Sequence, residues 1–358
     1  MPEIDKLLRH LKENKGSDLH LSAGLPPRVR VRGALEEVPG WPVLSDAAVA
    51  GIMQEFCEPR HWQAFVETND CDFAYGLPGI ARFRVNFFRQ QNGASAIARI
   101  IPETILSLEQ LNALPVIASF ADLTQGLVLV TGPTGSGKST TLAGIIDRIN
   151  TTYSKHIVTI EDPVEFVHQP KKCLFSHREV GRHTKSFAHA LKAAIRQDAD
   201  VVLVGELREY ETISLALQAA EMGCLVFGTL HTNSAAKTID RLIDAFPAEE
   251  QDQARLMLSE SLAGIVSQLL LKTADGAGRC AVQEILVRTP GLPNLIREAN
   301  VPMIYSTIQS GKALGMQTMD EALMDLVKSH RVTADDAYMK AMDKSRFEKM
   351  LKGAPAVV

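Results

Sequence analysis

The sequence predicts an α/β domain built on a parallel sheet, preceded by a smaller α+β domain. The first observation is that apolar runs typical of strands alternate with helical runs from residue 126 onward. The second is that the strand runs, at residues 127–131, 157–160, 201–204 and 225–230, are almost continuously apolar, as in a sheet covered on both faces. The third is a glycine-rich run at 132–139, which joins the first strand to a helical run.

The chain before residue 102 is predicted to form the α+β domain. Residues 4–11 carry isoleucine and leucine at helical spacing. Residues 81–89 alternate apolar and basic side chains, as a strand with one solvated face does, and a tight turn leads into a second strand at 94–101. From about residue 259 the pattern is mostly helical. We therefore expect a domain at 1–101, a linker at 102–125, a core at 126–270 and a mostly helical region at 271–358.

Composition excludes several classes of protein. A hydrophobic content of 46% and a charged content of 22% are those of a globular protein. The net charge of −4 gives no general reason to expect a nucleic-acid partner. No apolar run reaches the roughly 18–20 residues that span a bilayer, and the first residues lack the order of a signal peptide. The five cysteines form no Cys-x-x-Cys pair. We expect a cytoplasmic protein without a transmembrane segment.

Residues 132–139 read GPTGSGKS and fit the phosphate-binding pattern G-x-x-x-x-G-K-[ST] at every fixed position. Glycines let backbone N–H groups close around phosphate oxygens, and the helix N-terminus adds a favourable field. In such loops the lysine reaches the β- and γ-phosphates and the serine holds Mg²⁺. The alternative is a chance glycine-rich turn, and the strand and helix on either side argue against it. The candidate nucleotide-binding residues are Gly132, Thr134, Gly135, Ser136, Gly137, Lys138, Ser139 and Thr140.

Three further strand runs end in a polar residue that is chemically competent. Glu161 follows the second strand, Glu206 follows the third, and His231 follows the fourth. Ligands of open α/β sheets bind outside the carboxyl ends of the strands. If the four strands are neighbours in one parallel sheet, these side chains converge on phosphates held by Lys138.

That convergence suggests roles in hydrolysis of a nucleoside triphosphate. Glu161 is the candidate general base that orients the attacking water, Glu206 acts on Mg²⁺ through water together with Ser139, and His231 contacts the γ-phosphate. Each residue also has a simpler interpretation. Glu161 would only end a strand, Glu206 would form a surface ion pair with Arg208, and His231 would be an ordinary loop residue.

The predicted hairpin of the first domain carries arginines, and the sequence shows no obvious arginine close to the phosphate-binding loop that could stabilise the reacting phosphate. A phosphate-binding domain hydrolyses slowly by itself, and an arginine from a neighbouring subunit raises the rate by roughly 10³–10⁵. Arg84 and Arg99, with Arg82 close behind, are the candidates. The alternative is a solvated strand face.

These motifs together resemble the secretion-type ATPases, and within them the PilT/PilU type IV pilus retraction ATPases. The resemblance rests on 132–139, on TIEDPVEF at 159–166, on LVGELR at 203–208 and on GTLHTNSA at 228–235. It extends to GSDLHL at 16–21, RFRVN at 82–86, REVG at 178–181, MLSESL at 257–262 and GMQTMD at 315–320. It covers nearly the whole chain.

The resemblance implies a PAS-like first domain, a RecA-like ATPase core, ATP and Mg²⁺ as ligands, and a homohexameric ring in which the first domain packs on the next subunit. It implies a motor that powers pilus retraction from the cytoplasmic face of the inner membrane, acting on a platform protein there. Extension-type relatives often carry four zinc-binding cysteines and a longer N-terminal region, and neither is present in this sequence.

One segment departs from the family. Retraction members typically read Ala-Ile-Arg-Asn-Leu-Ile where this chain has Gly291, Leu292 and Pro293 before Asn294, and the proline is expected to disturb a helix start. This departure leaves two roles open: the chain retracts pili alone, or it assists a paralogous motor. Two further alternatives are a secretion or pilus-extension ATPase and a nucleotide-binding accessory subunit with vestigial hydrolysis. A nucleic-acid translocase is opposed by the acidic balance.

Overall fold

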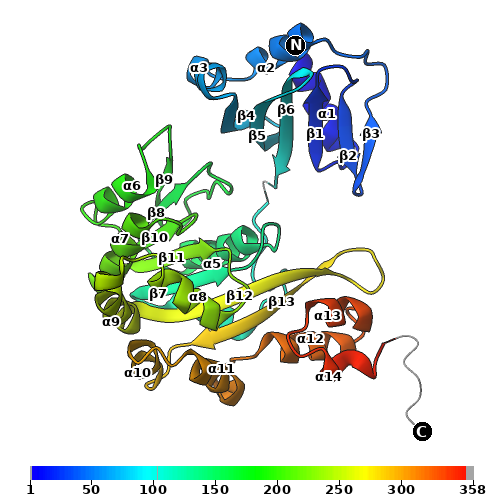
Figure 1. The fold of residues 1–358 in the computed structure, drawn as a ribbon. Coiled ribbons are helices and arrows are strands. Elements are labelled where there is room, and N and C mark those ends of the chain that lie inside the picture. Colours follow the sequence, from blue (N-terminus) through cyan, green and yellow to red (C-terminus); the bar gives the residue numbers. More distant parts are fainter. Residues whose placement is uncertain (1, 103, 352–358) are drawn as a thin grey trace. The chain divides into compact units, whose positions relative to one another are not determined.

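A computed structural model describes residues 2–102 and 104–351, so the end of the region predicted at 271–358 lies outside the described residues. The chain divides into two compact units. The first comprises Met1–Thr104 with Asp162–Val167, and the second comprises Ile105–Glu161 with His168–Val358. Figure 1 traces the elements of each unit. Among the described helices, none has both the length and the apolar character needed to cross a bilayer.

The first unit is an antiparallel sheet of six strands with three helices. The strand order is β3-β2-β1-β6-β5-β4. The elements are α1 (Glu3–Glu13), β1 (Asp18–Ser22), β2 (Arg28–Val31), β3 (Ala34–Glu37), α2 (Asp46–Glu55), α3 (Pro59–Thr68), β4 (Asp70–Leu77), β5 (Ala81–Gln90) and β6 (Gly93–Ile101). The predicted hairpin is confirmed, because β5 pairs with β6 in antiparallel register from Arg82 to Gln90. The predicted helical stripe is also confirmed, since Ile4, Leu7, Leu8 and Leu11 are fully buried.

The second unit is built on a sheet of seven strands in the order β13-β12-β7-β11-β10-β8-β9. The strands are β7 (Gly126–Thr131), β8 (His156–Glu161), β9 (Leu174–Glu179), β10 (Val201–Val204), β11 (Leu225–Leu230), β12 (Leu262–Lys272) and β13 (Arg279–Val287). All neighbours pair in parallel except β12 and β13, which form an antiparallel hairpin. The four strands predicted from the sequence are therefore consecutive neighbours, as the site requires.

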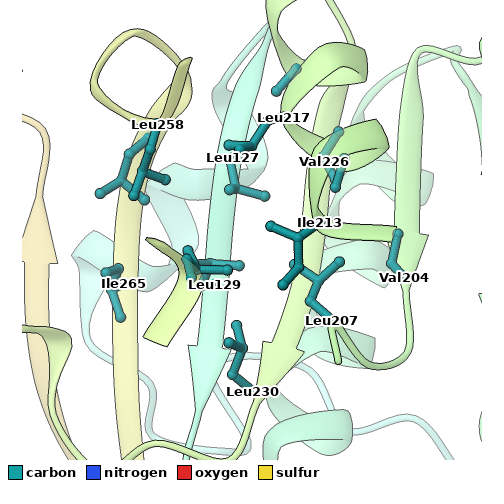
Figure 2. Packing of buried hydrophobic residues seen from close by; sticks show 14 of the residues in the cluster. Leu127, Leu129, Val204, Leu207, Ile213, Leu217, Val226, Leu230, Leu258 and Ile265 are labelled. Atoms are coloured by element: carbon teal, nitrogen blue, oxygen red, sulfur yellow. The ribbon is translucent and has the colours of Figure 1, made fainter. Parts of the chain in front are cut away.

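Helices bury both faces of this sheet. They are α4 (Pro115–Ser119), α5 (Lys138–Thr152), α6 (Phe187–Ala194), α7 (Tyr210–Glu221), α8 (Ala235–Ile243), α9 (Gln251–Ser261), α10 (Leu292–Arg297), α11 (Val301–Ser310), α12 (Met319–Lys328), α13 (Ala334–Lys340) and α14 (Ser345–Glu348). On one face, Leu127 and Leu129 of β7 pack with Ile213 and Leu217 of α7 (Figure 2). On the other, alternate residues of the same strands pack against α5. The wholly buried strands explain their continuous apolar sequence.

The prediction of a mostly helical chain from about residue 259 was wrong for residues 262–287, which form the β12–β13 hairpin. Both strands are buried on two faces, so their apolar runs show no alternation, and such runs are not distinguished from a buried helix by periodicity. The expectation that Pro293 disturbs a helix start was also wrong. Pro293 lies in the first turn of α10, where no backbone N–H donor is needed.

Candidate functional site

The glycine-rich loop lies between β7 and α5, as predicted, and its glycines adopt backbone conformations that other residues disfavour. Gly132, Gly135 and Gly137 have φ values of 143°, 78° and 86°. A Cβ atom on Gly132 would lie 2.1 Å from the carbonyl oxygen of Gln268 on β12. Glycine is therefore required at this position by both conformation and space.

Lys138 is the first residue of α5 and folds back over the loop. Its Nζ atom donates hydrogen bonds to the carbonyl oxygens of Gly132, at 2.8 Å, and Pro133, at 3.2 Å. The side chain is 9% exposed. A buried ammonium group at a helix N-terminus, held over backbone N–H groups, makes this loop a binding site for an anion such as phosphate.

The other loop residues divide between the surface and the interior. Thr134 and Gly135 are exposed, and Ser139 and Thr140 are half-buried at the start of α5. Ser136 is only 3% exposed, and its Oγ atom has no hydrogen-bond partner among the described residues.

The polar residues predicted at the strand ends lie along one edge of the sheet. Glu161 is the last residue of β8 and is 8% exposed. Glu206 lies two residues past β10, and His231 directly follows β11. Because β7, β11, β10 and β8 are consecutive parallel neighbours, their carboxyl ends place the loop and these three side chains at the same edge.

Glu206 and His231 are brought into direct contact. The Nε2 atom of His231 lies 3.5 Å from Oε1 of Glu206, which is an ion pair when the imidazole is protonated. The same carboxylate oxygen lies 3.4 Å from Nε of Arg208, so the surface pair considered as an alternative is also present. The Glu206 loop is anchored to β11, because Leu207 donates its N–H to the carbonyl oxygen of Thr229 at 2.9 Å.

The three candidate arginines lie on one exposed face of the first unit's sheet. Arg84 is directly opposite Arg99 in the β5–β6 register. Nε of Arg99 donates to the buried carboxylate of Asp18 at 2.6 Å. Nη1 of Arg82 donates to the backbone of Glu165 at 3.3 Å, and this segment belongs to the same unit. Their participation in a nucleotide site stays a prediction.

Sequence reasoning missed the buried polar residues of the β12–β13 hairpin, which include Gln268, Gln283 and Glu284. Gln268 is 2% exposed, Gln283 is 8% exposed and Glu284 is 1% exposed. Burial raises the pKa of the Glu284 carboxyl group. The hydrogen bonds that this group accepts from the backbone N–H groups of Ala235 and Met319 lower the pKa by a smaller amount. A polar residue in the middle of a continuously apolar run was the available signal, because such a residue must find partners in the interior.

Comparisons with known proteins show the family of the chain. The family model described as type II/IV secretion system protein matches residues 69–354. The chain is 51% identical to the type IV pilus retraction ATPase PilT of Pseudomonas aeruginosa, over 95% of this chain and 98% of that protein. It is 50% identical to a twitching motility protein of Neisseria gonorrhoeae, over 88% of this chain and 84% of that protein.

Solved structures show the same fold. The crystal structure of the pilus retraction motor PilT with bound ADP superposes with a TM-score of 0.87 at 42% identity, covering 96% of this chain and 99% of that one. The Legionella pneumophila ATPase DotB superposes with a TM-score of 0.82 at 28% identity, covering 94% of each chain. The predicted fold class, a RecA-like core with a smaller N-terminal α+β domain and C-terminal helices, is confirmed by these matches.

Proposed function

The chain belongs to the type II/IV secretion system protein family, in the group of type IV pilus retraction ATPases, and from that premise we propose that it is a motor that hydrolyses ATP to power pilus retraction. One observation carries the proposal. A complete phosphate-binding loop, Glu161, Glu206 and His231 lie at the carboxyl ends of four consecutive parallel strands. The strand next to β7 leads to the imidazole, and the two strands beyond it lead to the carboxylates, so all of these groups lie at the same edge of the sheet as the loop.

In the proposed reaction Lys138 exchanges partners. Its ammonium group now donates to two loop carbonyl groups, and we propose that the β- and γ-phosphates replace them when ATP binds. The loop N–H groups and the half-buried Ser139 and Thr140 hold the remaining phosphate oxygens. Glu161 accepts a hydrogen bond from the attacking water and orients it in line with the γ-phosphate. His231 contacts the γ-phosphate, which bonds to the water oxygen as ADP leaves, and Glu206, already in contact with His231, would act on Mg²⁺ through water.

The residues present also fit Mg²⁺. Mg²⁺ prefers oxygen ligands, binds through one or two protein groups together with substrate phosphates, and keeps several waters. Ser139 and Glu206 offer one hydroxyl and one carboxylate oxygen. No group of three or more acidic, histidine or cysteine side chains suited to a metal occurs in the described part of the chain, in keeping with a metal held mainly by the nucleotide. When bound, Mg²⁺ would neutralise charge on the phosphates.

We propose that the site is completed by an arginine from the first domain of a neighbouring subunit in a homohexamer. Arg84 is the favoured candidate, because its Nε atom lies 4.0 Å from Asp72 and its side chain is 45% exposed. Arg99 is held at 2.6 Å by Asp18, and Arg82 donates to a backbone carbonyl group. Arg84 therefore gives up the weakest contact when it turns to a phosphate. In this proposal residues 1–101 act across the subunit boundary, and residues 102–125 connect them to their own core.

Mixing experiments test the shared site. Purified Lys138→Ala and Glu161→Ala variants are each expected to lose ATP turnover at least a hundredfold, and Arg84→Ala to lose a similar factor. Mixing Lys138→Ala with Arg84→Ala subunits should restore turnover, because some interfaces then combine an intact loop with an intact arginine. The matched control mixes Lys138→Ala with Glu161→Ala, where no interface is intact. Equal activity in the two mixtures would refute the shared site, and normal turnover by Glu161→Ala would refute its role as base.

The machine is the second part of the proposal. We propose that the ring acts from the cytoplasm on an inner-membrane platform protein of the type IV pilus, alone or beside a paralogous motor. The relatives at 51% and 50% identity carry names of retraction and twitching motility, and a PilU pilus ATPase of Pseudomonas aeruginosa is 39% identical over 98% of this chain. Pilus retraction in a deletion strain complemented by this chain tests it. Complementation that needs a second motor would identify an assisting role.

A further inference from the structure

Gln268 lies directly beneath the phosphate-binding loop. The β12 strand pairs in parallel with β7, and Ser267 is level with Thr131, so that Gln268 sits beside the first residue of the loop. A Cβ atom on Gly137 would lie 2.9 Å from Nε2 of Gln268, and a Cβ atom on Gly132 would meet its carbonyl oxygen. The two loop glycines therefore make room for this residue as well as for a ligand.

The side-chain amide of Gln268 is hydrogen-bonded to the loop and to the helix that follows it. Its Nε2 atom donates to the carbonyl oxygen of Ser136 at 2.6 Å. Its Oε1 atom accepts from the hydroxyl group of Thr141, on the first turn of α5, at 2.9 Å. A single amide thus ties the backbone of the loop to the helix whose N-terminus faces the phosphate site.

A second glutamine fixes which way this amide points. Nε2 of Gln283, on β13, donates to Oε1 of Gln268 at 2.7 Å. If the Gln268 amide turned over, two NH₂ groups would face each other and the carbonyl oxygen of Ser136 would meet an oxygen atom, which is unfavourable among residues as buried as Gln268 and Gln283. In the observed orientation the amide of Gln268 donates to the carbonyl oxygen of Ser136 and accepts from Thr141 and Gln283.

We propose that Gln268 is the positioning residue of the nucleotide site: its amide holds Ser136 and Thr141 in the spacing at which the loop N–H groups converge on phosphate. Gln268 acts through the loop and does not touch the nucleotide. The inference rests on the proposed ATPase function and adds a requirement on a strand that carries no part of the phosphate-binding motif. A loop whose conformation is already fixed by Gln268 loses less conformational entropy when a ligand binds.

The test compares two glutamine-to-glutamate changes. Gln268→Glu keeps the size of the side chain and the acceptor for Thr141, and replaces the donor to Ser136 by an oxygen. Gln317→Glu is the control, because Nε2 of Gln317 also donates to a backbone carbonyl group, that of Gln283 at 2.8 Å, and among the described residues it makes no hydrogen bond to the loop. Both changes set an oxygen against a backbone carbonyl group, so both are expected to lower the melting temperature.

The nucleotide measurements separate the two variants. With a fluorescent ADP analogue as the probe, Gln268→Glu is expected to raise the dissociation constant at least tenfold and to raise KM for ATP more than it lowers kcat. Gln317→Glu is expected to leave both constants within twofold of wild type. Equal dissociation constants for Gln268→Glu and wild type would overturn the inference, as would equal losses in the two variants.

A second variant decides the matter if Gln268→Glu does not fold. Gln268→Met keeps the shape without any polar group, and it is expected to weaken ADP binding by a smaller factor than Gln268→Glu because it introduces no repulsion. Wild-type affinity in a folded Gln268→Met protein would overturn the inference. Failure of the wild-type chain itself to bind and hydrolyse ATP would instead refute the proposed function.

Discussion

His168 gives the second unit a stability that depends on pH. Its side chain is 3% exposed, and its ring stacks on Phe175 with centroids 5.2 Å apart and planes 2° apart. The ring of His177 lies 6.2 Å away. Burial, together with the neighbouring His177, lowers the pKa of His168 from 6.5 to about 4. The folded chain therefore keeps this imidazole neutral at pH values where the unfolded chain protonates it.

The sign and size of the effect follow by linkage. A group whose folded pKa lies below its unfolded pKa favours the folded state least at low pH, because protons then bind the unfolded chain. The contribution is intact above about pH 6.5 and is lost as the pH falls toward about 4. Between pH 7 and pH 5 the free energy of unfolding should fall by about 2 kcal/mol from this residue alone.

Urea unfolding at pH 7 and pH 5 measures this difference. The His168→Phe variant keeps an aromatic ring in the stack and removes the titration, so its loss between the two pH values should be about 2 kcal/mol smaller than that of wild type. The comparison is made within each variant, so a packing cost common to both pH values cancels.

The control variant is His330→Asn, which removes an exposed histidine at a left-handed backbone position that asparagine tolerates. Circular dichroism follows the whole chain, whereas tryptophan fluorescence follows the first unit, since Trp41 and Trp62 both belong to it. The pH-dependent loss of unfolding free energy should appear in the unfolding transition of the second unit, as followed by circular dichroism. A loss between pH 7 and pH 5 that is the same in His168→Phe, His330→Asn and wild type would refute the argument.

Three further predictions concern buried groups and the loop. Glu284→Ala should lower the free energy of unfolding by about 3 kcal/mol in a urea titration, because two helix N–H groups lose their acceptor; an unchanged midpoint would contradict this. Gly132→Ala should abolish binding of a fluorescent ADP analogue, whereas Gly135→Ala, whose Cβ atom meets no neighbour within 4 Å, should retain measurable binding; equal loss in both would show that space is not the cause. Asp18→Asn should remove the ion pair with Arg99 and lower the tryptophan-monitored stability by about 1 kcal/mol; no shift in that transition would mean that the pair contributes nothing.

The nucleotide loop was predictable because its signal is local. A strand, eight residues of fixed pattern and a helix are contiguous in the chain, and the glycines are required by the backbone itself. The strand ends were predictable for a related reason. Glu161 and His231 each directly follow an apolar run, and their placement at one edge needed only the assumption, since confirmed, that the runs belong to one parallel sheet.

The hairpin could not be predicted by the same means. Residues 262–272 and 279–287 are largely buried on both faces and mostly apolar, so periodicity does not separate them from a buried helix. The role of Gln268 depends on contacts more than one hundred positions away along the chain, at Ser136 and Thr141. A single sequence shows that a glutamine interrupts an apolar run, and only the fold shows what it contacts.

The β12–β13 hairpin, which was not predicted from the sequence, connects the phosphate-binding loop to the start of the helix that follows His231. Gln283 and Glu284 are adjacent on β13, so their side chains leave opposite faces of the sheet. Gln283 reaches the phosphate-binding loop through Gln268. Glu284 accepts one hydrogen bond from the N-terminus of α8 at 2.8 Å and another from the N-terminus of α12 at 3.3 Å. Helix α8 begins four residues after His231. Gln283 and Glu284 therefore connect the phosphate-binding loop, the N-terminus of α8 and the N-terminus of α12 to the same strand. A movement of the loop that shifts β13 must then also shift the N-termini of both helices.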